Sequence, residues 1–167
     1  MQAASARAYE LRACLEADAD FVVALTETVM CDHAVRTWGR WDPAYHRAEY
    51  HRAFGRLEHS IVICDGTEAG YLAIHRRDEV DYLQWLLLLP AFQNRGIGSA
   101  IVSDLIRTAA PGKPLQLRVL PVNAGARRLY ERLGFAVTHT EGDFVYLEHP
   151  AGTAGRNPPA TDRRRLP

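Results

Sequence analysis

The residues best suited to chemistry lie in a short polar turn, residues 93–99 (QNRGIGS), between an apolar run and an amphipathic segment. Gly96 and Gly98 lack a Cβ atom, so the backbone can approach a ligand closely and adopt dihedral angles that other residues avoid. The first amides of a helix that begins here have no partner within the helix and lie at the positive end of its dipole. Together with the charge of Arg95, the turn is therefore predicted to bind an anion such as a diphosphate.

Several kinds of turn compete for this stretch. A Walker loop requires Gly-Lys-Ser or Gly-Lys-Thr, and the chain contains neither. A dinucleotide-binding fingerprint requires a third glycine, where this chain has Ile101. What remains is Gln-x-Arg-Gly-x-Gly after an apolar strand and Pro90. A strand-to-helix turn that binds nothing is the plain alternative.

A second motif follows at residues 123–135 (NAGARRLYERLGF). Its apolar residues recur at intervals of three and four, which predicts an amphipathic helix. The two motifs, in this order and with one predicted strand between them, resemble the CoA-binding loop and the N-x-x-A-x-x-L-Y-x-x-x-G-F segment of the GNAT superfamily of N-acetyltransferases. The resemblance is clearest over residues 60–148.

The resemblance implies that acetyl-CoA is the co-substrate. In this family the end of the long strand pairs through its backbone with the pantetheine arm, as an added strand would. The loop amides hold the diphosphate, and Asn123 would contact the pantetheine arm or shape its channel. Asn94 stands where the family usually has a glycine. The positions assigned to acetyl-CoA in this way are Leu86, Leu87, Leu88, Gln93, Asn94, Arg95, Gly96, Ile97, Gly98, Ser99, Asn123 and Tyr130.

The resemblance also implies a catalytic role for Tyr130. A neutral primary amine would attack the thioester carbonyl directly, and the strand amide near Leu88 would stabilise the tetrahedral oxyanion. Tyr130 would then protonate the leaving thiolate as a general acid. The alternative is that Tyr130 is an aromatic residue packed on the core side of its helix.

The general base is missing from both positions where relatives carry a glutamate, because this chain has Leu87 and Arg118 there. The amine must lose its proton to another group, to a water chain or before it binds. The candidate bases outside the motifs are His46, Glu49, His51, His139, Glu141 and Asp143. The absent carboxylate also leaves a second hypothesis open, a CoA-binding sensor or interaction module without catalysis.

The acceptor site is predicted from aromatic residues near a turn. Trp38, Trp41 and Tyr45 could line a pocket for an apolar or cationic small amine, because tryptophan faces attract cations. They could equally fix the loop to the core. A peptide N-terminus or a lysine side chain also stays open as the acceptor.

The strands and helices that position these motifs are predicted from the spacing of apolar residues, which alternate in strands and recur every three or four positions in helices. Strands are expected at residues 9–14, 60–64, 69–76, 82–89, 115–120, 135–140 and 143–148. Helices are expected after Asp18 or Asp20, after Asp42, after Gly98 and after Asn123. We predict one α/β domain with a mixed, mostly antiparallel sheet of six or seven strands and helices on both faces. Strands 82–89 and 115–120 should run parallel and splay apart around the pantetheine.

Composition bounds the remaining expectations. The 167 residues have a formal net charge of zero and three widely spaced cysteines. We predict one domain at residues 1–150, a disordered Arg-rich tail at 151–167, and a cytoplasmic protein with reduced thiols. No apolar run approaches a membrane span, and no Cys/His cluster has zinc-ligand spacing. We therefore expect no membrane, nucleic-acid or metal partner. A homodimer is expected by analogy with relatives.

Overall fold

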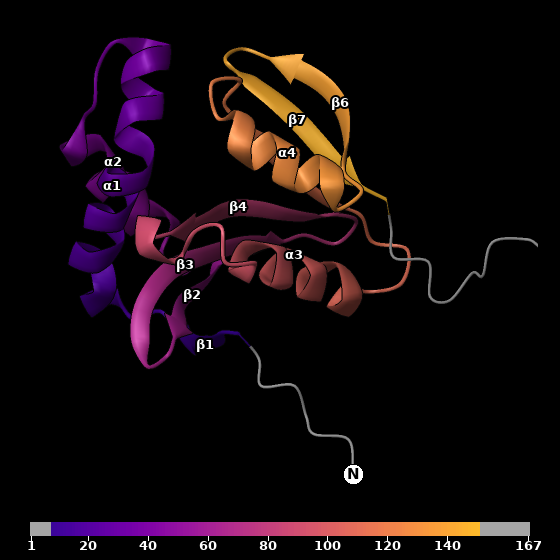
Figure 1. The fold of residues 1–167 in the computed structure, drawn as a ribbon, viewed down its shortest axis with the longest axis horizontal. Helices are drawn as coiled ribbons and strands as arrows, with labels where there is room; N and C mark the ends of the chain where they lie inside the picture. Colours follow the sequence, from indigo (N-terminus) through magenta and orange to yellow (C-terminus); the bar gives the residue numbers. More distant parts are fainter. Residues whose placement is uncertain (1–7, 151–167) are drawn as a thin grey trace, which may run out of the picture.

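In the computed structural model, residues 8–150 are described, and within them seven strands form one sheet in the order β1-β2-β3-β4-β5-β7-β6 (Figure 1). The strands are β1 (Glu10–Ala13), β2 (Glu58–Cys64), β3 (Thr67–Arg76), β4 (Asp81–Leu88), β5 (Leu115–Val119), β6 (Ala136–Glu141) and β7 (Phe144–His149). The helices are α1 (Ala19–Trp38), α2 (Pro43–Ala53), α3 (Ile97–Thr108) and α4 (Ala124–Arg132). Only β4 and β5 pair in parallel, so the predicted mixed, mostly antiparallel α/β fold is confirmed. The predicted tail lies outside the described residues.

Helices cover both faces of the sheet, as predicted (Figure 1). α1 and α2 pack on one face, around a core that includes Leu25, Tyr50 and Leu87. α3 and α4 pack on the other face, around a core that includes Ile101 and Leu117. The sheet therefore buries side chains on both sides, which explains why β4 reads as a nearly continuous apolar run.

The ends of α1 and α2 follow from local chemistry. Asp42 caps α2, as predicted, because its carboxylate accepts a hydrogen bond from the Tyr45 amide at 3.0 Å. Asp18, one of the two caps predicted for α1, stands at its N-cap position, but its carboxylate makes no capping bond there. It is held instead by Arg12 and by the Leu15 amide, at the start of a short 3₁₀ turn, Glu16–Asp18. α1 ends at Gly39, whose φ of +75° is left-handed and favours glycine.

The start of β4 is fixed by a buried carboxylate. Asp81 is 3% exposed and forms ion pairs with Arg76 and Lys113. Its amide donates to the Pro114 carbonyl at 3.0 Å, at the first position where β4 pairs with β5. Burial acts to raise the pKa of Asp81, but the hydrogen bonds from Lys113 and Arg76 outweigh it and lower that pKa. These contacts tie the two central strands together at one end only.

Candidate active site

The central feature of the sheet is a slot between β4 and β5. The two strands pair only from Asp81 to Leu83 on β4 and from Leu115 to Leu117 on β5. Directly after the last pair, the register of β3 against β4 shifts, which leaves Gln84 as an extra residue on β4. An extra residue of this kind bends its strand and increases the local twist. β4 therefore turns away from β5 where the slot opens.

The end of β4 has no neighbouring strand on the side of this slot. Leu89 donates its amide to the Ala69 carbonyl on the β3 side at 2.8 Å. Backbone groups of successive strand residues point in opposite directions, so those of Leu88 and Leu86 point toward the slot. The Leu88 carbonyl accepts a hydrogen bond from Gln93 Nε2 at 2.8 Å. By the same alternation, the Leu88 amide points into the slot, where no strand lies beside it.

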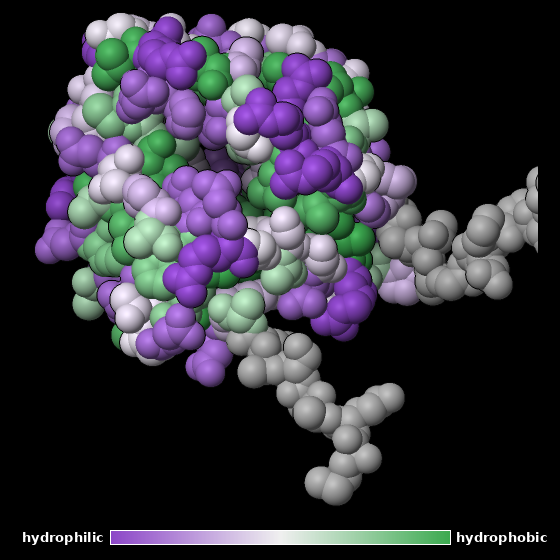
Figure 2. Space-filling model, in the orientation of Figure 1, coloured by the Kyte–Doolittle hydropathy of each residue, from purple (hydrophilic) through white to green (hydrophobic). Residues whose placement is uncertain are grey.

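A cavity of about 640 Å³ occupies this slot. Figure 2 shows this face of the molecule hollowed between α1 and α4. Its lining brings together the end of β4, the polar turn, α4 and one side of α1. The predicted cofactor residues in the lining are Leu86, Leu88, Gln93, Asn94, Gly96, Gly98, Ser99, Asn123 and Tyr130. Two motifs that are far apart in the sequence therefore meet in one space.

The polar turn has the backbone geometry of an anion site. Asn94 and Gly96 have left-handed φ values of +57° and +79°. Asparagine is among the few non-glycine residues that tolerate this region, which accounts for Asn94 in place of glycine. α3 begins at Ile97, and its first amides face the turn without helical acceptors. A Cβ on Gly98 would meet only Leu129 and Leu88, at 3.6 and 3.7 Å, so the space beside this glycine is the cavity.

Three predicted cofactor residues have side chains outside the cavity lining. Leu87 points to the opposite face and is buried in the core under α1 and α2. Ile97 is buried in the core under α3. Arg95 lies over the Phe92 ring and faces Asp65 at 3.4 Å. These three positions can contribute backbone groups to the site, whereas their side chains serve packing and the surface.

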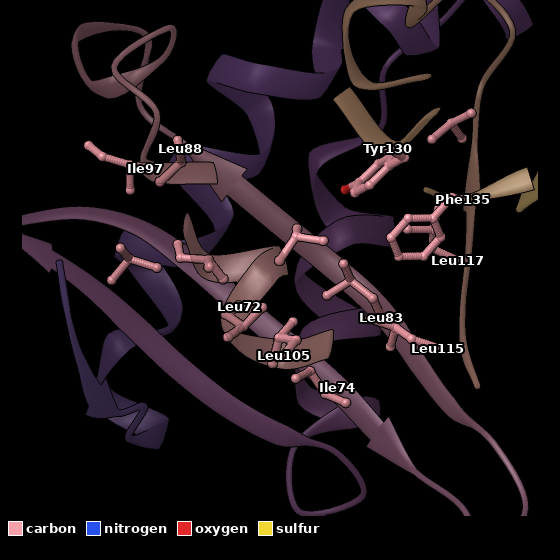
Figure 3. Packing of buried hydrophobic residues seen from close by; sticks show 14 of the residues in the cluster. Leu72, Ile74, Leu83, Leu88, Ile97, Leu105, Leu115, Leu117, Tyr130 and Phe135 are labelled. Carbon is pink, nitrogen blue, oxygen red and sulfur yellow. The ribbon is translucent and has the colours of Figure 1, made fainter. Parts of the chain in front are cut away.

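The two predicted residues of the second motif lie on the opposite wall from β4. Asn123 begins α4, and its side-chain oxygen accepts a hydrogen bond from the Ala126 amide at 3.1 Å. Tyr130 is 7% exposed, and its ring packs against Phe135 at 5.5 Å. Figure 3 shows the Tyr130 hydroxyl turned toward β4. Burial raises the pKa of Tyr130, so the phenol stays protonated at neutral pH, as a general acid must.

A second, larger cavity of about 1000 Å³ lies between the sheet and the helices α1 and α2. We call it the acceptor groove. Of the predicted acceptor residues, Trp38 and Tyr45 line it, whereas Trp41 is not part of the lining and stacks on His46 at 3.9 Å. The groove also reaches β5 and β7 through Arg118 and Phe144, and Arg118 directly follows the last β5 residue that pairs with β4.

Comparison with known protein families identifies the family of this chain. The family model described as acetyltransferase (GNAT) family matches residues 24–135. This chain belongs to the GNAT family. No match to a curated protein was found.

Solved structures of GNAT proteins share the fold. PaiA N-acetyltransferase from Thermoplasma acidophilum, in complex with coenzyme A, is 15% identical with a TM-score of 0.65, over 85% of this chain and 98% of that one. The ribosomal-protein-S18-alanine N-acetyltransferase from Escherichia coli is 20% identical with a TM-score of 0.64, over 89% and 97%. A GNAT family acetyltransferase from Elizabethkingia anophelis with acetyl-CoA bound is 14% identical with a TM-score of 0.59, over 86% and 98%. At these identities the likeness concerns the fold.

The candidate bases are dispersed in this GNAT domain. Two of them, His46 and Glu49, line the acceptor groove. Burial lowers the pKa of His46, which keeps the imidazole neutral and able to accept a proton. Asp143 instead accepts a hydrogen bond from Trp38 Nε1 at 2.8 Å. The other three, His51, His139 and Glu141, line neither cavity.

Sequence reasoning missed two histidines. His75 lines the acceptor groove, and its Nδ1 accepts a hydrogen bond from Arg77 at 3.2 Å. His33 lines the slot cavity, and its buried Nδ1 has no hydrogen-bond partner among the described residues. The available signal was periodicity. His33 is four residues after Val29 on the apolar side of α1, and His75 follows Tyr71 and Ala73 at intervals of two, on the same face of β3.

Between residues 8 and 150, no group of three or more His, Cys, Asp or Glu side chains is arranged to hold a metal ion. In the same range, no helix is both long and apolar enough to cross a membrane.

Proposed function

We propose that this GNAT protein transfers the acetyl group of acetyl-CoA to a primary amine. The observation that carries the proposal is the slot. Leu86 and Leu88, which have no strand partner on the slot side, the amides at the start of α3 and the Tyr130 hydroxyl all line or face one cavity. An extended pantetheine arm beside β4 would place a diphosphate at the α3 N-terminus.

Each residue has a distinct task in the proposed transfer. Acetyl-CoA supplies an activated thioester. The amine nitrogen bonds to the carbonyl carbon, and the amide of Leu88 donates to the oxyanion that develops there. When the C–S bond breaks, Tyr130 gives its proton to the sulfur. The proton released by the nitrogen passes to a group in the acceptor groove or to solvent, and solvent later reprotonates Tyr130.

The direct test is release of free CoA thiol from acetyl-CoA across a panel of primary amines. Isothermal titration calorimetry with acetyl-CoA alone comes first, because the proposal requires that the cosubstrate bind without an acceptor. We expect binding, and thiol release that depends on the amine. Absence of heat with acetyl-CoA would remove the site assignment altogether.

A second candidate is a CoA-binding module without catalysis. It is favoured by one observation, the burial of Leu87 where relatives carry a catalytic glutamate. The same experiment separates the two, since this module would bind acetyl-CoA and release no thiol with any amine. The protonated Tyr130 facing the slot supports the enzyme.

The remaining expectations are part of the same proposal. We propose a cytoplasmic enzyme that uses no metal and needs neither nucleic acid nor a membrane as a partner. The homodimer stays a prediction, which the molar mass in solution would test.

A further inference from the structure

The acceptor groove carries more positive than negative charge. Its two carboxylates are both engaged within α2, because Asp42 caps the helix and Glu49 pairs with Arg52. The arginines in the lining are Arg40, Arg52, Arg56 and Arg118. Four arginines therefore face two carboxylates, and among the ion pairs of residues 8–150 none includes Arg40, Arg56 or Arg118.

Of the four arginines in the groove lining, only Arg118 lies on a strand of the sheet. It follows Leu117, the last residue of β5 that pairs with β4. Its guanidinium lies 3.9 Å from the centroid of the Phe144 ring, and its Nη1 is 3.4 Å from the Tyr146 hydroxyl. Within residues 8–150, none of the ion pairs includes Arg118. A positive charge without an acidic partner therefore lines the groove directly after the residues where β4 and β5 stop pairing.

An aromatic wall holds this charge in place. The Trp38 ring packs 6.1 Å from the Phe144 ring, on which Arg118 lies. Trp38 Nε1 also donates to Asp143 at 2.8 Å, which fixes the end of α1 against the start of β7. A guanidinium held on an aromatic face keeps its donors free along its edge, where a planar carboxylate can bind with two hydrogen bonds.

We propose that the acceptor is a small amine that carries a carboxylate a few bonds from its nitrogen, as an amino acid does, and that Arg118 binds this carboxylate. The inference rests on the acetyl transfer proposed above and names its substrate class. It replaces the cationic amine that the aromatic residues alone suggested. Arginines in the groove repel a second cation, and they attract an anion that leads the amine into the slot.

The same charge also serves the nucleophile. A nearby positive group disfavours the protonated form of an amine, so the groove favours the neutral form that can attack a thioester. This effect operates at the site where Leu87 supplies no carboxylate base. The same arginines would then bind the carboxylate and favour the neutral form of the amine.

The test compares three probes of similar shape: phenylalanine, phenylalaninamide and 2-phenylethylamine. Methionine and leucine with their amides extend the panel to other side chains. With wild-type protein, kcat/KM for each amino acid should exceed that for its amide by about tenfold or more. In Arg118→Gln the ratio of kcat/KM for the amino acid to that for its amide should fall toward one, because KM for the amino acid rises. Arg118→Lys should retain part of the preference for the amino acid. Arg36→Gln is the matched control, because Arg36 is an exposed arginine on α1 outside the groove lining.

A binding measurement keeps the inference separable from the proposed function. Trp38 and Trp85 line the groove, so quenching of tryptophan fluorescence reports occupancy without turnover. If no amine is acetylated but amino acids quench more strongly than amides, and Arg118→Gln abolishes the difference, the carboxylate site at Arg118 stands and the enzyme proposal fails. Equal use or equal binding of acids and amides by wild-type protein would overturn the inference. A preference that survives in Arg118→Gln would also overturn it.

Discussion

Gly70 on β3 lies directly opposite Leu88 on β4, and the two strands approach so closely there that only glycine fits. A Cβ at residue 70 would lie 2.3 Å from the carbonyl oxygen of Leu87 and 2.7 Å from the Leu88 side chain. The part of β4 that presents its backbone to the slot is thus positioned by a residue without a side chain.

Gly70→Ala should therefore disturb both stability and the slot. We expect a loss of about 1–3 kcal/mol in the free energy of unfolding by urea, because β4 must shift to admit the methyl group. Calorimetry should also show weaker acetyl-CoA binding. Gly98→Ala is the control for stability, since its Cβ would make only ordinary contacts at 3.6 Å and beyond. An unchanged urea midpoint for Gly70→Ala would contradict the close approach.

Tyr130→Phe should separate catalysis from binding. The ring packing against Phe135 is kept while the proton donor is removed. We expect kcat to fall by about 100-fold or more, with the dissociation constant for acetyl-CoA changed little. Stopped-flow thiol release and calorimetry measure the two quantities. Equal turnover in the variant would remove the acid role from Tyr130.

Ser99→Asp tests the anion site at the start of α3. Ser99 lines the slot cavity, so an aspartate there would repel a diphosphate. We expect the dissociation constant for acetyl-CoA to rise by about tenfold or more. The helix itself should not lose stability, because an acidic residue in the first turn suits the helix dipole. Ser103→Asp, on the exposed side of the same helix, adds the same charge and should bind normally. Similar affinities for both variants would contradict the assigned location of the diphosphate.

The buried Asp81 predicts a pH dependence of stability. Its pKa is lowered in the folded protein, so its contribution is present above its unfolded pKa of about 3.9 and is lost as pH falls through the lower folded pKa. Asp81→Asn should cost about 3 kcal/mol at pH 7, since Arg76 and Lys113 lose their buried partner.

Urea melts from pH 3 to pH 7 measure this contribution. The difference in stability between wild type and Asp81→Asn should shrink toward the acid end. Glu58→Gln is the control, because Glu58 is a largely exposed partner of the same Arg76 and should cost much less. A difference that stays constant across this pH range would contradict the role of Asp81.

The order and type of the elements could be predicted because their signals are local. The β-branched run in β2, the cap at Asp42 and the left-handed turn at Gly96 each depend on residues a few positions apart. Of the two predicted caps of α1, Asp18 takes the N-cap position, but Arg12, on a separate strand, binds its carboxylate and no capping bond forms. Local patterns cannot report a competing partner that only the fold supplies.

The slot cavity was predictable to a greater extent than the acceptor groove. Its lining is concentrated in two short motifs, whose loop and helix appear as continuous stretches of sequence. The groove instead draws single residues from several elements, including Gln84 on β4 and Arg118 on β5. The shifted register at Gln84 lies within a mostly apolar run that gives no sign of it. The chain is rich in arginine, and the sequence did not indicate which arginines would line the groove.

The parallel ladder between β4 and β5 joins strands β1 to β4 with strands β5 to β7 through only three residue pairs. Acetyl-CoA bound as proposed would lie against both groups of strands and continue the sheet beyond Leu83 with its own amides. The ligand would then be a structural component of the protein as well as a reactant. Resistance to unfolding should consequently rise and fall with the supply of acetyl-CoA, by the ordinary coupling of binding to folding.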